Sequence, residues 1–315
     1  MAENVSANFT SALDDISELE QPTLSTRIVT GIILAVICII GGLGNSRVII
    51  IFVKTPTLFS KTTRLILTAL ATVDFTGCLV NIPLAFGVLV LRPGRDELFY
   101  LSLAHVIATY CVLWCSYFCF VLIGCDMNDT VRKMTRRGNL LTVHRIRIAL
   151  VVMILSALGV GIFVYSLRVE DPFVLQTDTH RSGAKHRFGV FLRIAVFAAG
   201  VLSFLSLVHS FLRVRTVLKR HNRIMSELHG LNRKSDQMKQ KKMMRTVIEM
   251  FVCFVVVYMP LFVVNILQDQ GKLDSVDPIA IARAVFFMTY ASNFLVYGRN
   301  LRFFFRSFLS ACPCF

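Results

Sequence analysis

The sequence predicts an all-α membrane protein, a bundle of seven transmembrane helices, and two observations support this fold class. Seven apolar stretches are long enough to cross a bilayer, since a helix rising about 1.5 Å per residue needs about 20 apolar residues to do so. Composition agrees, because 55% of the 315 residues are hydrophobic and only 17% are charged. The predicted spans are 28–53, 65–91, 98–125, 148–167, 188–212, 246–268 and 279–298.

Charged residues bound these spans. The second span is the clearest, because Asp74 is the only charged side chain between Arg64 and Arg92. The first span ends at Lys54 and the third closes at Asp126. Each stretch must satisfy its backbone hydrogen bonds internally in lipid, so each is expected to be helical.

The distribution of basic residues predicts the topology. About two thirds of the 34 Lys and Arg fall in alternate loops and in the tail after the seventh span. The positive-inside rule places these segments in the cytosol and the acidic amino tail outside the cell. The net charge of +15 therefore follows the topology and does not indicate nucleic acid. The long basic loop at 213–245 is expected to meet anionic membrane lipids or a cytosolic partner.

The chain divides into three predicted regions. Residues 1–27 form an extracellular tail with glycosylation sequons at Asn4 and Asn8. Residues 28–298 form the seven-helix domain, and 299–315 form an interfacial helix and cytosolic tail. No cleavable signal peptide is visible, so the first span is expected to direct export.

The segment after the seventh span is amphipathic. It carries Arg at helical spacing on one side and Leu and Phe on another, which predicts a short helix lying in the membrane interface. The alternative is a solvated end of the seventh span. Cys312 and Cys314 follow this segment and are candidate palmitoylation sites.

Polar residues within the spans predict a buried cluster. Asn45, Asp74 and Ser116 all lie roughly 14 to 15 Å from the inner boundary, and Asn293 approaches from a shallower level. An ionisable group near the bilayer centre costs at least ~3 kcal/mol unless it has a partner. The cluster could hold a sodium ion, or it could be a hydrogen-bonded network without an ion. No other cofactor is expected.

Span six contains Phe254, Tyr258 and Pro260. The proline removes an amide donor and predicts a kink, and the two rings share a face beside it. A ligand pressing from outside could then swing the inner end of this span. The alternative is a static kink.

Several motifs occur in order along about 280 residues. They are GN at Gly44 and Asn45, Asp74 in LATVDF, Asp126, Phe254 with Tyr258 and Pro260, and Asn293 with Tyr297. This series resembles the class A (rhodopsin-like) G-protein-coupled receptors.

The resemblance implies a plasma-membrane receptor for an extracellular ligand, with a cytosolic cleft for a heterotrimeric G protein or other transducer. It implies a sodium site around Asp74, Ser116 and Asn293. It also implies that activation involves switch residues near the cytosolic end and in span six. They are Asp126, Met127, Phe254, Pro260 and Tyr297.

The sequence also departs from the family pattern. Asp126-Met127-Asn128 stands where the family has Asp-Arg-Tyr, and Phe294 stands where the family has proline. Losing the arginine raises the alternative of an atypically coupled receptor, or of a decoy or partner subunit that does not signal. A transporter or channel is disfavoured, because among the span residues only Asp74 is both ionisable and central.

By alignment to the family, Thr109 occupies the position where amine receptors keep an aspartate, so an amine ligand is not expected. The candidate residues of the outer cavity are His105, Thr109, Arg193, Tyr258 and Arg283. The cations suggest an anionic or lipid-like ligand, since a desolvated guanidinium binds carboxylate or phosphate bidentately. Alternatively, they are hydrated or pair with the acidic residues of 170–178.

Two further classes are excluded. A retinal-binding opsin needs a lysine in the middle of the seventh span, and 284–298 contains none. An enzyme is excluded because no nucleophile–base pair, Gly-rich phosphate loop or metal-ligand spacing occurs in the loops.

Overall fold

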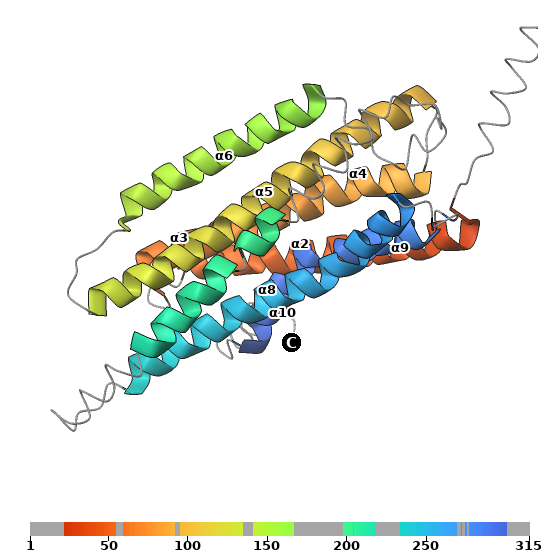
Figure 1. Cartoon of the computed structure of the whole chain (residues 1–315). Helices are drawn as coiled ribbons and strands as arrows, with labels where there is room; N and C mark the ends of the chain where they lie inside the picture. The colour runs from red at the N-terminus through yellow and green to blue at the C-terminus, as the bar shows by residue number, and fades with distance from the viewer. Residues whose placement is uncertain are drawn as a thin grey trace, which may run out of the picture.

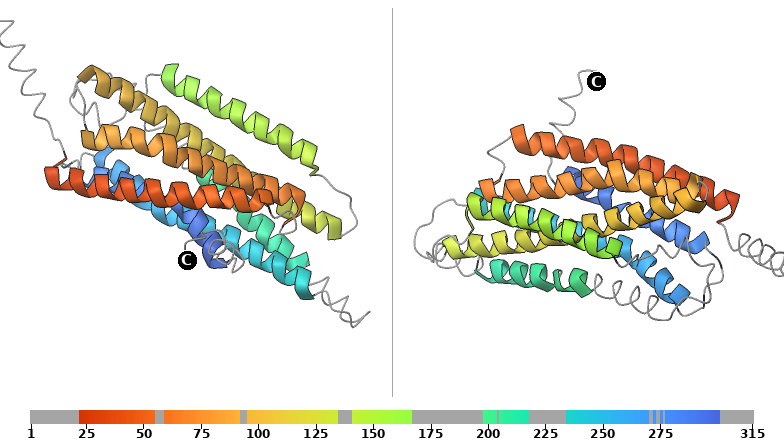
Figure 2. Two further views of the ribbon diagram at one scale, coloured as in Figure 1. Left: turned by 180° about the vertical axis from the view of Figure 1, so that it is seen from behind. Right: turned by 90° about the horizontal axis from the view of Figure 1, so that it is seen from above.

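A computed structural model describes residues 22–54, 59–91, 95–134, 141–166, 198–203, 205–217, 234–269, 272, 275 and 277–300. Within these residues all regular structure is helical, and long helices lie side by side in one elongated bundle (Figures 1 and 2). Seven are long and apolar enough to cross a membrane. The predicted seven-helix fold class is therefore confirmed.

The helices follow the predicted spans. They are α2 (Leu24–Lys54), a composite second span, α5 (Arg95–Met134), α6 (Val143–Ser166), the segment Ala198–Val217, α8 (Lys234–Asp269), and α9 (Asp277–Phe286) with α10 (Thr289–Asn300). Helices α5 and α8 extend beyond the apolar stretches into polar sequence, because a helix need not end where the hydrocarbon does. The first ten residues of the predicted fifth span and the predicted interfacial helix from 301 onward lie outside the described residues.

The second span begins four residues earlier than predicted. Helix α3 (Lys61–Thr76) starts after Ser60, whose side-chain oxygen accepts a hydrogen bond of 3.1 Å from the backbone N–H of Thr63. This bond satisfies one of the free amides of the first turn, as an N-cap does. The cap, and not the edge of the apolar run, sets the helix boundary.

Two wide turns interrupt the second span. It continues from α3 through η1 (Gly77–Asn81), α4 (Ile82–Phe86) and η2 (Gly87–Leu91), where the η segments are π-helical. In η1 the backbone N–H of Ile82 donates to the carbonyl of Gly77, five residues back. Pro83 follows directly and supplies no amide, so a locally wider turn relieves the helix there.

The seventh span breaks without a proline. A turn at Phe287 and Met288 separates α9 from α10, and the amide of Tyr290 donates to the carbonyl of Phe287 over 3.1 Å. The side chain of Thr289 also bonds a backbone group, donating to the carbonyl of Phe286 over 2.9 Å. Phe294, in the place of the family's proline, lies instead against Gly44, where any added Cβ would meet its ring.

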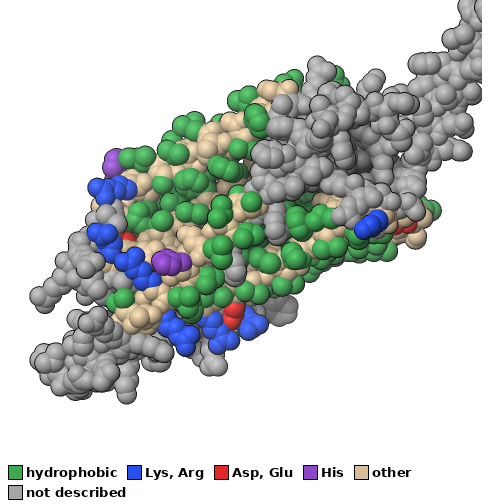
Figure 3. Space-filling model, viewed as in Figure 1, with side chains coloured by type: hydrophobic (Ala, Val, Ile, Leu, Met, Phe, Trp, Pro, Cys, Tyr) green, Lys and Arg blue, Asp and Glu red, His purple; other side chains and the backbone are tan. Residues whose placement is uncertain are grey.

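Burial identifies which spans are central. In span seven 61% of the apolar window is buried inside the protein, against 22% in spans four and six. Apolar side chains cover the outer sides of the bundle, as expected of surfaces that face lipid (Figure 3). Lys and Arg gather at one end (Figure 3), which we call the basic end and at which α2 ends at Lys54 and α3 begins at Lys61.

Candidate functional site

A buried carboxylate lies at the centre of the bundle. Asp74, in α3, is only 2% exposed, and it accepts a hydrogen bond of 2.7 Å from the side-chain amide of Asn293 in α10. Two residues of the predicted cluster are therefore in direct contact. The bond joins the second span to the seventh.

Asn45 of α2 lies beside the same part of α10. Its side-chain amide donates to the backbone carbonyl of Tyr290 over 2.6 Å. The side-chain oxygens of Asn45 and Asn293 are both buried and accept no hydrogen bond from any described residue. The site thus combines one carboxylate with two amide oxygens that have unused acceptor capacity.

Ser116 does not join this network in the way the sequence suggests. Its hydroxyl is buried but donates to the carbonyl of Val112, one turn earlier in its own helix α5, over 3.0 Å. A serine in a membrane helix has this local acceptor always available. Ser116 therefore forms no described hydrogen bond to Asp74.

A second series of hydrogen bonds, which runs through Asn81, was not predicted from the sequence. Asn81 is fully buried, and its side-chain amide donates to the hydroxyl of Tyr290 over 2.7 Å. Its carbonyl oxygen lies 3.1 Å from the hydroxyl of Thr109 in α5. Asn81 is a polar residue in the middle of an apolar span, and that was the available signal. Gly77 makes the approach possible, because a Cβ there would lie 2.9 Å from the ring of Tyr290.

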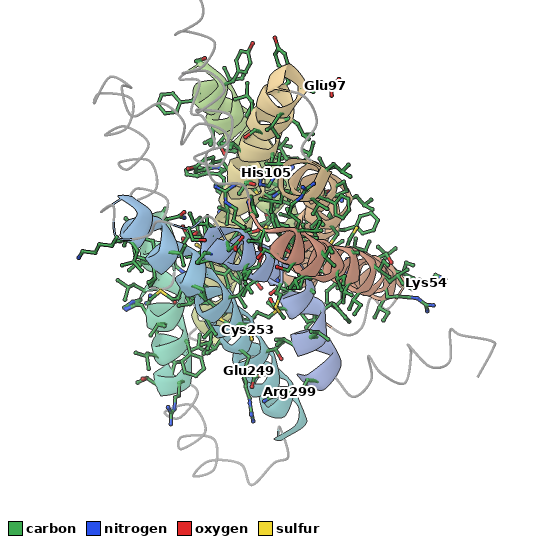
Figure 4. The ribbon with its side chains drawn as sticks, turned by 90° about the vertical axis from the view of Figure 1, so that its right-hand side faces the viewer. Lys54, Glu97, His105, Glu249, Cys253 and Arg299 are labelled. Carbon is green, nitrogen blue, oxygen red and sulfur yellow. The ribbon has the colours of Figure 1, made fainter. Side chains whose placement is uncertain are left out.

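Two of the predicted residues of the outer cavity, His105 and Tyr258, contact aromatic rings of span seven. His105 of α5 is buried, with its ring centroid 5.8 Å from that of Phe287 (Figure 4). The hydroxyl of Thr109 is also within 2.9 Å of the backbone carbonyl of His105. Arg283 is half-buried in α9, whereas Arg193 lies outside the described residues.

Span six faces the bundle through a row of rings. Phe254 and Tyr258 are stacked, with centroids 6.1 Å apart and planes 6° from parallel, so they share a face as predicted. Phe254 also meets Tyr117 of α5 edge-on at 5.5 Å. Tyr258 meets Phe286 of α9 at 5.8 Å. Helix α8 runs without interruption through Pro260, and the kink remains a prediction.

Asp126 is held by span two. The hydroxyl of Thr62 donates to one carboxylate oxygen over 2.7 Å, and the hydroxyl of Thr63 donates to the other. Both threonines stand in the first turn of α3, where the helix dipole favours an anion. Asp126 is only 3% exposed. This arrangement explains how the buried carboxylate is stabilised although the family's arginine is missing.

The neighbours of Asp126 have separate roles in packing. Met127 is 1% exposed and belongs to the apolar cluster near the basic end. Asn128 donates through its side-chain amide to the hydroxyl of Ser210 over 2.8 Å, which joins α5 to the fifth span. Tyr297 of α10, another of the predicted switch residues, is buried and packs edge-on against Phe52, with ring centroids 5.5 Å apart.

Four of the predicted modification sites cannot be placed. Asn4 and Asn8 of the amino tail, and Cys312 and Cys314 of the carboxyl tail, lie outside the described residues. Glycosylation and palmitoylation therefore remain predictions.

The comparisons with known proteins agree with this geometry. A family model described as "7 transmembrane receptor (rhodopsin family)" matches residues 44–295. The crystal structure of squid rhodopsin is similar, with a TM-score of 0.70 at 18% identity, over 94% of this chain and 89% of that chain. At this identity the likeness shows the fold alone. A search of the curated proteins gives no match.

The fold and the buried polar site define a multi-pass membrane protein of the seven-helix receptor class. The family match covers most of the chain, so this protein belongs to the rhodopsin family of seven-transmembrane receptors. It is a receptor and not an enzyme. Family membership implies an extracellular ligand and a G-protein transducer.

The clamp on Asp126 can be tested by removing the two hydroxyls. The double substitution Thr62→Val and Thr63→Val preserves shape but removes two hydrogen-bond donors from a buried carboxylate. We expect it to lower the free energy of unfolding by about 2–4 kcal/mol, measured as a lower Tm in detergent.

The matched control is Thr72→Val with Thr76→Val, whose hydroxyls bond only carbonyls of their own helix and are exposed. Adding Asp126→Asn to the first double variant should recover part of the loss, because the neutral amide costs less to bury. Equal Tm values for the native protein and the Thr62, Thr63 variant would contradict the clamp.

Proposed function

We propose that this protein is a cell-surface receptor that binds an extracellular ligand and signals to a heterotrimeric G protein by movement of span six. The observation that carries the proposal is the uneven distribution of polar contacts between helices. Among the described residues, buried hydrogen bonds tie spans one, two, three and seven to one another, and Phe251, Phe254 and Tyr258 of span six pack on this group through aromatic rings.

The spans joined in this central network are one, two, three and seven. The bonds that join them are Asn45 to Tyr290, Asn293 to Asp74, Asn81 to Tyr290, Thr109 to Asn81, and Thr62 and Thr63 to Asp126. Each is buried or partly buried, where leaving a polar group without its partner is costly. These spans are therefore expected to keep their relative positions.

Span six has a different kind of contact. Its rings Phe254 and Tyr258 pack against rings of α5 and α9, and Phe251 meets Phe120 edge-on at 5.3 Å. Ring contacts tolerate several offset arrangements at similar energy, so they can rearrange without stranding a donor or acceptor. Pro260 adds a point at which the helix lacks one backbone hydrogen bond.

Movement of span six can be measured directly. The experiment requires spin labels at the native Cys125 of α5 and at Lys241→Cys of α8, in a protein whose other cysteines have been replaced. We expect added nucleotide-free G protein of the matching class to lengthen the distance between the labels, because its docking requires span six to move outward.

The same experiment separates signalling from non-signalling receptors. A distance unchanged by every class of G protein would contradict coupling and favour a decoy or partner subunit, an alternative motivated by the buried Met127. Met127→Arg then distinguishes the two causes. If it restores G-protein activation, the absence of an arginine at position 127 is enough to explain why the native receptor does not couple.

The Asp74 cluster is the proposed site of a sodium ion. Na⁺ is a hard cation that takes oxygen ligands. Such oxygens are offered by the Asp74 carboxylate and by the amides of Asn45 and Asn293, which accept no hydrogen bond from the described residues. The ion would neutralise the buried carboxylate, whose charge is otherwise expensive at this depth. The competing interpretation is a hydrogen-bonded network without an ion.

Sodium binding predicts a specific dependence of stability on salt. Replacing choline chloride with NaCl at equal ionic strength should raise the Tm of the native protein, because an ion that binds only the folded state stabilises it. Asp74→Asn should abolish this increase. Equal Tm values of the native protein in both salts would support the network without an ion.

We further propose that the amino terminus is extracellular and that the basic end faces the cytosol. The gathering of Lys and Arg at one end supports this orientation (Figure 3). An epitope at the amino terminus should be detected on intact cells, while an epitope at the carboxyl terminus should require permeabilisation. The reverse pattern would overturn the orientation and the receptor proposal with it.

The ligand is proposed to be anionic, with Arg283 as its partner. Arg283 is half-buried in the last turn of α9, at the end of the bundle opposite to the basic end. Lipid acids, peptides and nucleotides form the screening set. For any acidic ligand found, Arg283→Met should weaken the response at least tenfold while Arg283→Lys retains part of it. Unchanged responses at preserved surface expression would exclude this role.

A further inference from the structure

At the basic end, span three carries Asp126 and Met127 where the family pattern has Asp and Arg. Asp126 of span three is already engaged by Thr62 and Thr63 of span two. Met127, which stands in place of the arginine, is buried among apolar side chains and carries no charge. The Asp126-Met127 pair therefore offers no cation with which to hold span six.

Span seven is placed to restrain span six. Helix α8 lies along α9 and α10, which together form the seventh span (Figures 1 and 2). Span seven is itself fixed, because Asn293 bonds Asp74 and the carbonyl of Tyr290 accepts from Asn45. A contact between α8 and the end of α10 thus joins a helix proposed to move to one that is held.

Such a contact exists at the basic end. Glu249 of α8 accepts a hydrogen bond of 2.7 Å from Arg245, one turn earlier in the same helix. The guanidinium of Arg299, at the end of α10, lies 3.7 Å from the same carboxylate oxygen. Figure 4 shows Glu249 and Arg299 side by side on neighbouring helices. One carboxylate is therefore shared between a cation of its own helix and a cation of span seven.

The contact lies far along the helix from Pro260. Glu249 precedes Pro260 by 11 residues, which places it about 16 Å along the helix from the proline. A bend at Pro260 displaces the basic end of α8 more than any part nearer the proline. A weak contact at Glu249 consequently opposes the movement more effectively than an equal contact beside Phe254.

We propose that Glu249 and Arg299 form a latch that holds the basic end of span six against span seven in the resting receptor. The inference rests on the proposed movement of span six. Arg245 bonds the same carboxylate but lies in the same helix as Glu249, so it does not link two helices.

The strength of the latch should be modest. The side chains of Arg245 and Arg299 are 70% and 71% exposed, whereas that of Glu249 is 22% exposed. Exposed ion pairs contribute little and are screened by salt. Breaking the cross-helix pair is therefore expected to raise the fraction of molecules with span six displaced by about two- to fivefold.

The test uses the labels at Cys125 and Lys241→Cys, without ligand or G protein. Arg299→Gln and Glu249→Gln should each raise the long-distance fraction by that factor. The matched control Arg245→Gln removes the cation within the same helix and should leave the fraction unchanged. The reciprocal exchange Glu249→Arg with Arg299→Glu, in the Arg245→Gln background, should restore the native fraction.

Salt gives a readout that simple loss of packing would not produce. Raising KCl from about 50 mM to about 500 mM should raise the long-distance fraction of the native protein but not that of Arg299→Gln. Native-like distances in Arg299→Gln at both salt concentrations would overturn the latch. If G protein still lengthens the distance in that case, the proposed function stands and only the latch fails.

Discussion

The hydrogen bond from Asn293 to Asp74 is the interaction on which the interior of this receptor depends. A carboxylate at the depth of Asp74 is expensive in a bilayer, and the protein encloses it almost completely. Its partner comes from span seven, so satisfying the charge requires span seven to occupy the centre of the bundle. This requirement agrees with the high burial of that span compared with spans four and six.

Two further contacts place span seven in register with its neighbours. The side-chain amide of Asn45 donates to the backbone carbonyl of Tyr290, and that of Asn81 donates to the Tyr290 hydroxyl. Each approach needs a small residue, since the ring of Phe294 covers Gly44 and the ring of Tyr290 covers Gly77. Polar specificity and close packing therefore act together, because the hydrogen bonds form only when the helices can come near one another.

The departures from the family pattern are compensated locally. The carboxylate of Asp126 keeps its place, but two threonine hydroxyls and the start of α3 stabilise it instead of an arginine. Met127 then becomes a packing residue of the apolar cluster. Phe294 replaces the family's proline, and the break in span seven occurs earlier, at Phe287 and Met288. The architecture is preserved while the residues available to control span six have changed.

The sequence by itself determined the seven spans, their approximate limits and the depth of Asp74. These follow from local properties, namely apolar length, helical rise and the cost of burying charge. The stacking of Phe254 on Tyr258 was predictable for the same reason, since both rings lie in one helix. Tertiary structure decided which polar groups meet. Ser116 shares the depth of Asp74 yet bonds its own helix, whereas Asn81, Thr62 and Thr63 gain partners from other spans. The π-helical turn before Pro83 changes which side of the helix the following residues occupy. A regular helical period does not predict this change.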